Sequence, residues 1–240
     1  MAEAKRCLVL GGSGYVGGDV CRLLAERDAR VAFTYWRHEV SHAQALGLRV
    51  DLRDFAATED AVTQAAERLG GLDVLVQCAG TAGDAALYKG GGLDKLQAIT
   101  EAGWDEMMDI TAKSSFAACR AAARAMAGRG GQIVLVGSMD GVKTVPAPIH
   151  YAASKGALRA MVQALAKELG PKRILVNMVA PGILDGGLAK LLSDELLQEY
   201  LKHSSLKRSG TAREVAELVA WLALENSYLT GQSIVLDGGL

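Results

Sequence analysis

The chain has 240 residues, of which 50% are hydrophobic, and its formal net charge is −1 at pH 7. This balance gives no electrostatic case for nucleic-acid binding, and no apolar run reaches the ~20 residues that a membrane span requires. The length suits one α/β domain, so we expect a single domain over residues 1–240. The cysteines and histidines lack metal-ligand spacing, and we interpret the cysteines as core thiols of a cytoplasmic protein without a signal peptide.

The N-terminal pattern predicts a strand from Arg6 to Leu10 and a helix from Tyr15 to Arg27. A glycine-rich turn joins them. Glycines let the backbone approach a pyrophosphate, and the helix N-terminus supplies N–H donors and a positive dipole end. The alternative is a flexible loop. We predict dinucleotide binding by Gly11, Ser13, Gly14, Tyr15, Val16 and Gly17.

The second predicted strand, Val31 to Tyr35, ends without the acidic residue that would bond the ribose hydroxyls of NAD. Arg37 follows and could instead bind the 2′-phosphate of NADP. The alternative is that Arg37 is a solvated residue at the start of the next helix. We therefore favour NADP(H) over NAD(H), with its adenosine end near Tyr35, Trp36 and Arg37.

The middle of the chain predicts further strands and helices, followed by a long connection. Its expected elements are strands at Leu48–Asp51 and Asp73–Val76 and helices at Asp54–Leu69 and Trp104–Met126. The connection over residues 81–103 contains a bend at Lys89-Gly90-Gly91-Gly92. It forms either part of a substrate rim or an inert surface loop.

An apolar run from Gln132 to Val136 predicts a buried strand, and a helix is expected from Tyr151 to Leu169. Ser138 follows the strand, while Tyr151 and Lys155 are four residues apart and share one helix face. The three groups can converge at the carboxyl edge of the sheet, where open α/β folds bind ligands. We expect Lys155 to lower the pKa of the Tyr151 phenol from its usual ~10, and Ser138 to hold a substrate oxygen. The alternative is an ordinary amphipathic helix.

The spacing of Ser138, thirteen residues before Tyr151, and the run Tyr151-Ala152-Ala153-Ser154-Lys155-Gly156-Ala157 resemble the short-chain dehydrogenase/reductase family. The likeness extends from Arg6 to Gly239 and is greatest to the single-domain branch that includes 3-oxoacyl-carrier-protein reductases. It implies a Rossmann-type, doubly wound parallel α/β sheet of about seven strands in the order 3-2-1-4-5-6-7, with helices on both faces. It also implies a homo-oligomer, either a tetramer or a dimer.

The resemblance also assigns roles to individual residues. It gives Ser138, Tyr151 and Lys155 as the catalytic group, with Thr111 in place of the family's Asn, where its hydroxyl could still bind a water. Gln77 and Cys78 replace two Asn that brace the sheet in relatives, so some bracing must be supplied differently. Besides those named above, the implied cofactor contacts are Asp51, Leu52, Cys78, Ala79, Gly80, Tyr151, Lys155, Pro181, Gly182 and Ile183. Asp51 could equally cap a helix.

After a strand at Ile174–Val179, the two glycines at Gly186 and Gly187 predict a mobile segment, and we expect a substrate lid at about 183–210. Helices within Leu188–Leu201 would form the substrate wall. A helix at Ala212–Leu224 and a last strand within Thr230–Asp237 complete the chain. His150 precedes Tyr151 and could line the pocket, but we favour an exposed loop residue.

The leading hypothesis is therefore an oxidoreductase that transfers hydride between NADP(H) and a small carbonyl or alcohol substrate. By resemblance the substrate is a 3-oxoacyl thioester or a polyketide-like or cyclic ketone. A dinucleotide-binding sensor or scaffold without redox turnover is the second hypothesis, motivated by the replacements at Cys78, Thr111 and Gly186. The third hypothesis is an epimerase or dehydratase that uses the cofactor transiently. It is motivated by the glycine spacing G-x-x-G-x-x-G, which resembles the motif of the family's extended branch.

Overall fold

The computed structural model describes residues 3–38, 40, 42, 45–88 and 94–240. Within these residues, parallel strands form one sheet in the order β3-β2-β1-β4-β5-β6-β7, which confirms the predicted fold class. Their bounds are β1 (Arg6–Leu10), β2 (Arg30–Tyr35), β3 (Leu46–Arg49), β4 (Val74–Gln77), β5 (Gly131–Val136), β6 (Ile174–Pro181) and β7 (Ser233–Leu236). All of β1 is buried, as expected for a parallel strand that is covered on both faces. The third strand begins two residues earlier than predicted and leaves Asp51 in the turn that follows it.

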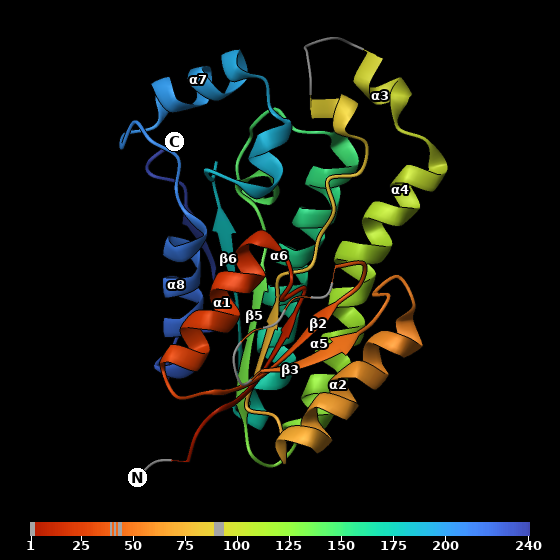
Figure 1. The fold of residues 1–240 in the computed structure, drawn as a ribbon, viewed down its shortest axis with the longest axis vertical. Helices are drawn as coiled ribbons and strands as arrows, with labels where there is room; N and C mark the ends of the chain where they lie inside the picture. The colour runs from red at the N-terminus through yellow and green to blue at the C-terminus, as the bar shows by residue number, and fades with distance from the viewer. Residues whose placement is uncertain (1–2, 39, 41, 43–44, 89–93) are drawn as a thin grey trace.

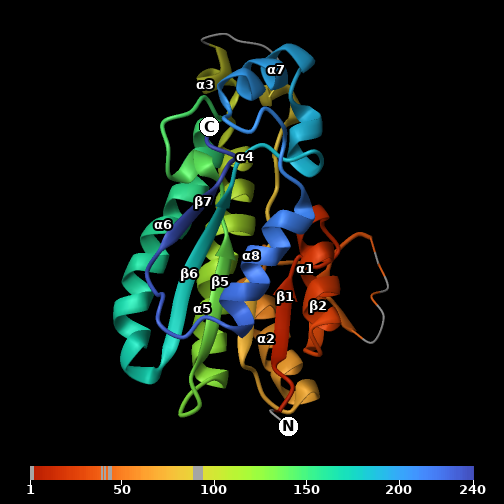
Figure 2. The same cartoon turned by 90° about the vertical axis from the view of Figure 1, so that its left-hand side faces the viewer.

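Helices cover both faces of the sheet (Figures 1 and 2). On one face, α1 (Tyr15–Glu26) and α8 (Ala212–Leu224) pack together. On the other lie α2 (Phe55–Leu69), α5 (Ser114–Ala125) and α6 (Ile149–Leu169). Because side chains alternate along a strand, β1 sends Leu8 and Leu10 into the apolar core beneath the second group and Cys7 and Val9 into the core beneath the first.

The helix predicted as one element over Trp104–Met126 is interrupted. The sequence forms α4 (Glu101–Met108), a π turn at Asp109–Lys113, and then α5. The run starts earlier than predicted because the Thr100 hydroxyl accepts the Gly103 N–H at 3.1 Å and caps the first turn. The π turn buries Thr111 completely, and π turns of this kind are often found at functional sites.

The alanines of α5 serve packing inside the chain. Ala118, Ala121 and Ala122 belong to the apolar core that α5 shares with α2 and the sheet. Small side chains at this spacing allow the helix to approach its neighbours closely. Phe116, on the same helix, remains 46% exposed.

The carboxyl ends of the strands point toward the end of the molecule that carries α3 (Asp94–Ala98) and α7 (Asp194–His203), at the upper right and upper left of Figure 1. The strand order reverses between β1 and β4, so this edge holds the switch point at which such sheets bind ligands. The connection predicted over 81–103 contains a 3₁₀ turn at Ala85–Tyr88 and α3, while the predicted bend at Lys89–Gly92 lies outside the described residues. In the described part of the chain, no helix is both long and apolar enough to cross a membrane.

Candidate active site

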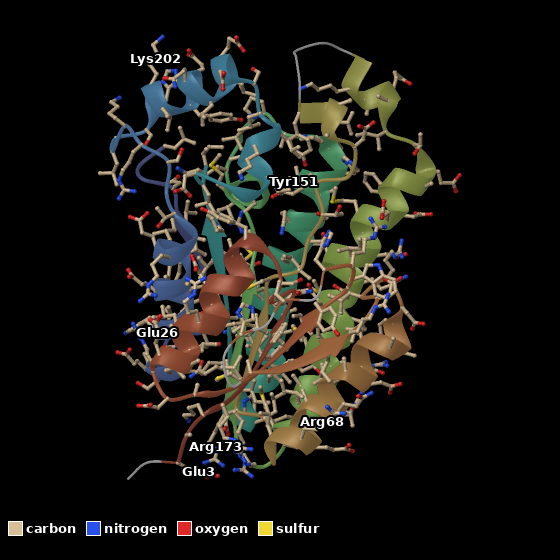
Figure 3. All side chains as sticks on the ribbon, viewed as in Figure 1. Glu3, Glu26, Arg68, Tyr151, Arg173 and Lys202 are labelled. Carbon is tan, nitrogen blue, oxygen red and sulfur yellow. The ribbon has the colours of Figure 1, made fainter. Side chains whose placement is uncertain are left out.

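Ser138, Tyr151 and Lys155 meet at the carboxyl edge of β5. The strand ends at Val136, and Ser138 then starts a 3₁₀ turn over Met139–Gly141. Helix α6 places Tyr151 and Lys155 one turn apart, and all three side chains are buried yet line one cavity of about 300 Å³. Figure 3 shows Tyr151 toward the end that carries α7, far from Glu3 and Arg173 at the opposite end.

The electrostatics of Tyr151 differ from the prediction. Burial raises the pKa of its phenol above the usual value, and the negative charge of Asp140 adds to this shift. A hydrogen bond with Ser138 acts in the opposite direction but does not outweigh burial. The expected lowering by Lys155 is therefore wrong for this structure. A phenol that stays protonated at neutral pH is able to donate its proton to a substrate oxygen.

Lys155 lies close to this phenol. Burial lowers its pKa to about 8, while the negative charge of Asp140 partly opposes the shift. The ammonium Nζ donates to the Val136 carbonyl at 3.3 Å and lies 5.7 Å from the centre of the Tyr151 ring. A positive charge at this position would stabilise a phenolate after the phenol has given up its proton.

The glycine-rich turn forms the other end of the same cavity. Gly11 adopts a φ of +74°, which favours glycine, and a Cβ on Gly17 would lie 2.2 Å from the Gly11 carbonyl oxygen. Side chains are thus excluded where the turn enters α1, so a pyrophosphate could approach the backbone and the helix N-terminus. The residues present therefore fit a dinucleotide. The predicted cofactor residues that line the cavity are Gly14, Tyr15, Val16, Gly17, Cys78, Gly80, Tyr151, Lys155, Pro181, Gly182 and Ile183.

Other predicted cofactor residues lie outside this cavity, and several of them surround the ends of β2 and β3. The guanidinium of Arg49 lies 5.2 Å from the centre of the Trp36 ring. Arg53 holds Asp51 through two-pronged hydrogen bonds that lower the pKa of Asp51, and the helix cap is Asp54 instead. The predicted residues that do not line the cavity are Gly11, Ser13, Tyr35, Trp36, Arg37, Asp51, Leu52, Ala79 and Thr111.

Gln77 forms hydrogen bonds that brace the end of β4, where the family's two Asn are replaced. It is buried at the end of β4, where its amide nitrogen donates to the Ser114 hydroxyl at 3.0 Å and its amide oxygen accepts the Ala79 N–H at 2.8 Å. One side chain therefore ties the turn after β4 to α5. At the neighbouring position burial raises the pKa of the Cys78 thiol, which favours the protonated, weakly nucleophilic form.

His150 is not the exposed loop residue that was predicted. Helix α6 begins at Ile149, so His150 lies in its first turn and is only 1% exposed. Burial lowers the pKa of its imidazole and favours the neutral ring. Its Nδ1 has no hydrogen-bond partner within the described residues, and the same holds for the hydroxyl of Thr111.

The predicted lid contacts the glycine-rich turn. The Tyr15 hydroxyl donates to the Asp185 carboxylate, and Gly186 packs against the Tyr15 ring so closely that no Cβ would fit. The Asp185 N–H also donates to the Gly210 carbonyl at 2.8 Å, which ties the start of the segment to its end. The lid segment and the dinucleotide end of the cavity are therefore in direct contact.

Sequence reasoning missed three polar residues of the cavity, namely Tyr88, Asp140 and Tyr200. Asp140 could have been noticed as an acidic residue two positions after Ser138. Tyr88 comes from the long connection and Tyr200 from α7, and neither had a signal that tied it to the catalytic group.

Comparisons with known proteins agree with this geometry. A family model described as enoyl-(acyl carrier protein) reductase matches residues 15–240. A 3-oxoacyl-acyl-carrier-protein reductase from Rattus norvegicus is 34% identical, with 98% of each chain covered, and one from Chlamydia muridarum is 32% identical, with 98% of this chain and 97% of the relative covered.

Solved structures give the same result. A short-chain dehydrogenase/reductase from Serratia marcescens matches with a TM-score of 0.84 and 30% identity, over 99% of this chain and 98% of its own. A short-chain dehydrogenase from Burkholderia cenocepacia in complex with NADP matches with a TM-score of 0.82 and 32% identity, over 98% of this chain and 97% of its own.

Proposed function

The chain belongs to the short-chain dehydrogenase/reductase family, and from this premise we propose that it reduces a carbonyl compound to an alcohol with NADPH. The observation that carries the proposal is the buried, protonated Tyr151 beside Ser138 and Lys155, in a cavity continuous with the glycine-rich turn. A phenol in this state carries the proton that a carbonyl oxygen must receive, and the charge of Lys155 would favour its release.

In the proposed reaction Tyr151 donates its proton to the substrate oxygen, and Ser138 keeps that oxygen in position. The charge of Lys155 stabilises the phenolate that remains. The bound nicotinamide would supply the hydride. All three side chains are buried, which strengthens each of these electrostatic effects.

We prefer NADPH to NADH because β2 ends without an acidic residue and is followed by the exposed Arg37. Asp51, the nearest acidic side chain after β3, is already neutralised by Arg53. The related Burkholderia cenocepacia structure is a complex with NADP, which supports the same choice. A 2′-phosphate would find a positive charge at this end of the groove.

The substrate class is proposed from the relatives and from the cavity wall. The Rattus norvegicus and Chlamydia muridarum relatives are 3-oxoacyl-acyl-carrier-protein reductases, so we place a 3-oxoacyl thioester first and a polyketide-like or cyclic ketone second. Apolar side chains of the lid and of the loop before α6 would hold the carbon skeleton. They are Pro146, Pro148, Leu184, Leu188 and Leu192. We propose that residues 183–210 act as the lid over this wall.

The test is NADPH oxidation by the purified protein with acetoacetyl-CoA and a panel of cyclic ketones. Tyr151→Phe should lower kcat by about 10²–10⁴-fold and leave NADPH binding in place. Tyr228→Phe is the matched control, because Tyr228 is 94% exposed and does not line the cavity. Activity close to wild type in Tyr151→Phe contradicts the proposal.

The same experiment separates the alternatives. Tight NADPH binding with no consumption over the whole panel would favour a sensor or scaffold. Product formation without net change in the cofactor would favour an epimerase or dehydratase.

We also propose that the chain forms a homo-oligomer, a tetramer or a dimer. The exposed Trp104 and Phe116 on the α4–α5 run support this proposal, because aromatic side chains are enriched at the cores of interfaces. Light scattering of the purified protein at several concentrations measures the state directly, and a monomer throughout would contradict it.

A further inference from the structure

Asp140 places a carboxyl group in the cavity, next to Ser138. Burial raises the pKa of this carboxyl, while the hydrogen bond from Ser138 opposes the shift. Among the described residues that line the cavity Asp140 is the only acidic one, and Lys155 is the only basic one. The Ser138 hydroxyl donates to the Oδ2 of Asp140. Ser138 is also the group proposed to hold the substrate oxygen, so its single O–H would turn from Asp140 to that oxygen when a substrate binds. The carboxyl group of Asp140 would then be available to a second polar group of the ligand.

Tyr88 provides a second unused polar group in the same cavity. It is 8% exposed, and within the described residues its hydroxyl has no hydrogen-bond partner. Its ring packs edge to face against Tyr151, with centroids 6.3 Å apart. Burial raises the pKa of the Tyr88 phenol, and the neighbouring Tyr151 and Asp140 add to this shift. A buried hydroxyl without a partner is costly unless a ligand satisfies it.

The two groups together select one kind of ligand group. A carboxylate oxygen only accepts hydrogen bonds, whereas a phenol both donates and accepts. A thioester or ketone carbonyl could accept from Tyr88, but it would be repelled by the carboxylate of Asp140. An ammonium could donate to Asp140 but could not accept from Tyr88, and it would meet the charge of Lys155. A hydroxyl satisfies both groups at once.

We propose that the natural substrate carries a hydroxyl on the first or second carbon from the reacting carbonyl, and that this hydroxyl donates to Asp140 and accepts from Tyr88. The inference rests on the proposed carbonyl reduction and narrows its substrate class to hydroxyketones, either free or as hydroxylated 3-oxoacyl thioesters. Tyr88 thereby gives the long connection after β4 a role in the substrate site.

Two ketones that differ only at this position test the proposal. The purified protein is assayed with NADPH and either 2-hydroxyacetophenone or 2-methoxyacetophenone. Replacing O–H by O–CH₃ keeps the acceptor and removes the donor, so wild-type kcat/KM should be at least about tenfold higher for the hydroxyketone. A wild-type ratio near one, or a preference for the methoxy compound, overturns the proposal.

The variant Asp140→Asn tests the proposed hydrogen bond to Asp140 directly. The amide of Asn replaces one of the two acceptor oxygens by an NH₂ donor and removes the negative charge. The ratio of the two kcat/KM values should therefore fall at least about tenfold, irrespective of the absolute rates. Tyr88→Phe, which removes only the second partner, should lower the same ratio by about threefold or more.

Asp60→Asn on the exposed side of α2 removes a carboxylate elsewhere and should keep the wild-type ratio. If Asp140→Asn and Tyr88→Phe both keep that ratio, the proposal is wrong.

Failure of the proposed reaction is distinguishable from failure of this inference. If the wild type reduces neither ketone, the carbonyl reduction fails. Selectivity is then measured as binding of 1-phenyl-1,2-ethanediol and 2-methoxy-1-phenylethanol to the NADP⁺-loaded protein by calorimetry. At least about tenfold tighter binding of the diol, lost in Asp140→Asn, supports the hydroxyl site, and equal affinities refute it.

Discussion

Gly141 lies where the turn that carries Ser138 contacts α6, the helix that carries Tyr151 and Lys155. Replacing Gly141 by alanine should push this turn and this helix apart. A Cβ at this position would lie 2.5 Å from the Lys155 carbonyl carbon, 2.7 Å from its oxygen and 2.8 Å from the Gly156 nitrogen. These are backbone atoms inside α6, so they cannot turn away as a flexible side chain would. The turn that carries Ser138 must therefore move away from the helix that carries Tyr151 and Lys155.

The size of the effect follows from these distances. Ordinary contact starts at 3.4 Å, so the turn and the helix must separate by roughly 1 Å. A displacement of this size between catalytic groups costs about 10²-fold in rate. Overpacking costs about 1–3 kcal/mol of stability, which a domain of this size should tolerate. We therefore expect a folded Gly141→Ala variant with kcat/KM about 100-fold below wild type.

The assay combines thermal unfolding, NADPH binding and steady-state ketone reduction. Gly156→Ala is the matched control, because Gly156 is in the same helix beside Lys155 and a Cβ there meets nothing within 4 Å. It should gain about 0.5–1 kcal/mol in stability from its better helix propensity and keep its activity. Wild-type kcat/KM in a folded Gly141→Ala variant would refute the claim that contact between the turn and the helix sets the catalytic geometry.

Three further predictions follow from single residues. Arg37→Ala should lower the ratio of kcat/KM with NADPH to that with NADH by about tenfold, and an unchanged ratio would place the 2′-phosphate elsewhere. Since Lys155 is charged only below its pKa of about 8, kcat/KM for reduction should fall about tenfold per pH unit above that value, and Lys155→Arg should lose this break. Asp73→Asn should cost about 3–5 kcal/mol in urea unfolding, because the Arg6 side chain that it pairs with is only 4% exposed. Burial opposes ionisation of Asp73, but the bonds from Arg6 outweigh it and lower its pKa. The pair therefore stabilises the wild type above pH ~4 and is lost as pH falls further, a dependence that Asp73→Asn should lack.

Local patterns were sufficient for most of the fold. The strand at Arg6–Leu10 was predicted at its observed bounds because Cys7–Leu10 are continuously apolar and are followed by a glycine turn. The order of the strands came from the family resemblance, since no local pattern states which strands are neighbours. The π turn at Asp109–Lys113 was missed because a single wider turn leaves the apolar periodicity on both sides intact.

The catalytic group was predicted, but its environment was not. The spacing of Tyr151 and Lys155 revealed a charge one turn away from a phenol. It did not reveal that burial and Asp140 raise the pKa of that phenol. His150 was misplaced because the helix starts at Ile149, earlier than the apolar pattern indicated, and turns the imidazole inward. Burial of this kind depends on contacts between distant segments, which one sequence does not display.

Hydride transfer from the nicotinamide to the substrate carbon is the central claim, and isotope transfer measures it most directly. NADPH that carries deuterium at one of the two faces of C4 is supplied with a ketone that the protein reduces, and the alcohol is analysed by mass spectrometry. One of the two labelled cofactors should deliver a single deuterium to the carbinol carbon, and the other none. An alcohol without deuterium from either cofactor would contradict direct transfer and remove the basis for the roles given to Ser138, Tyr151 and Lys155.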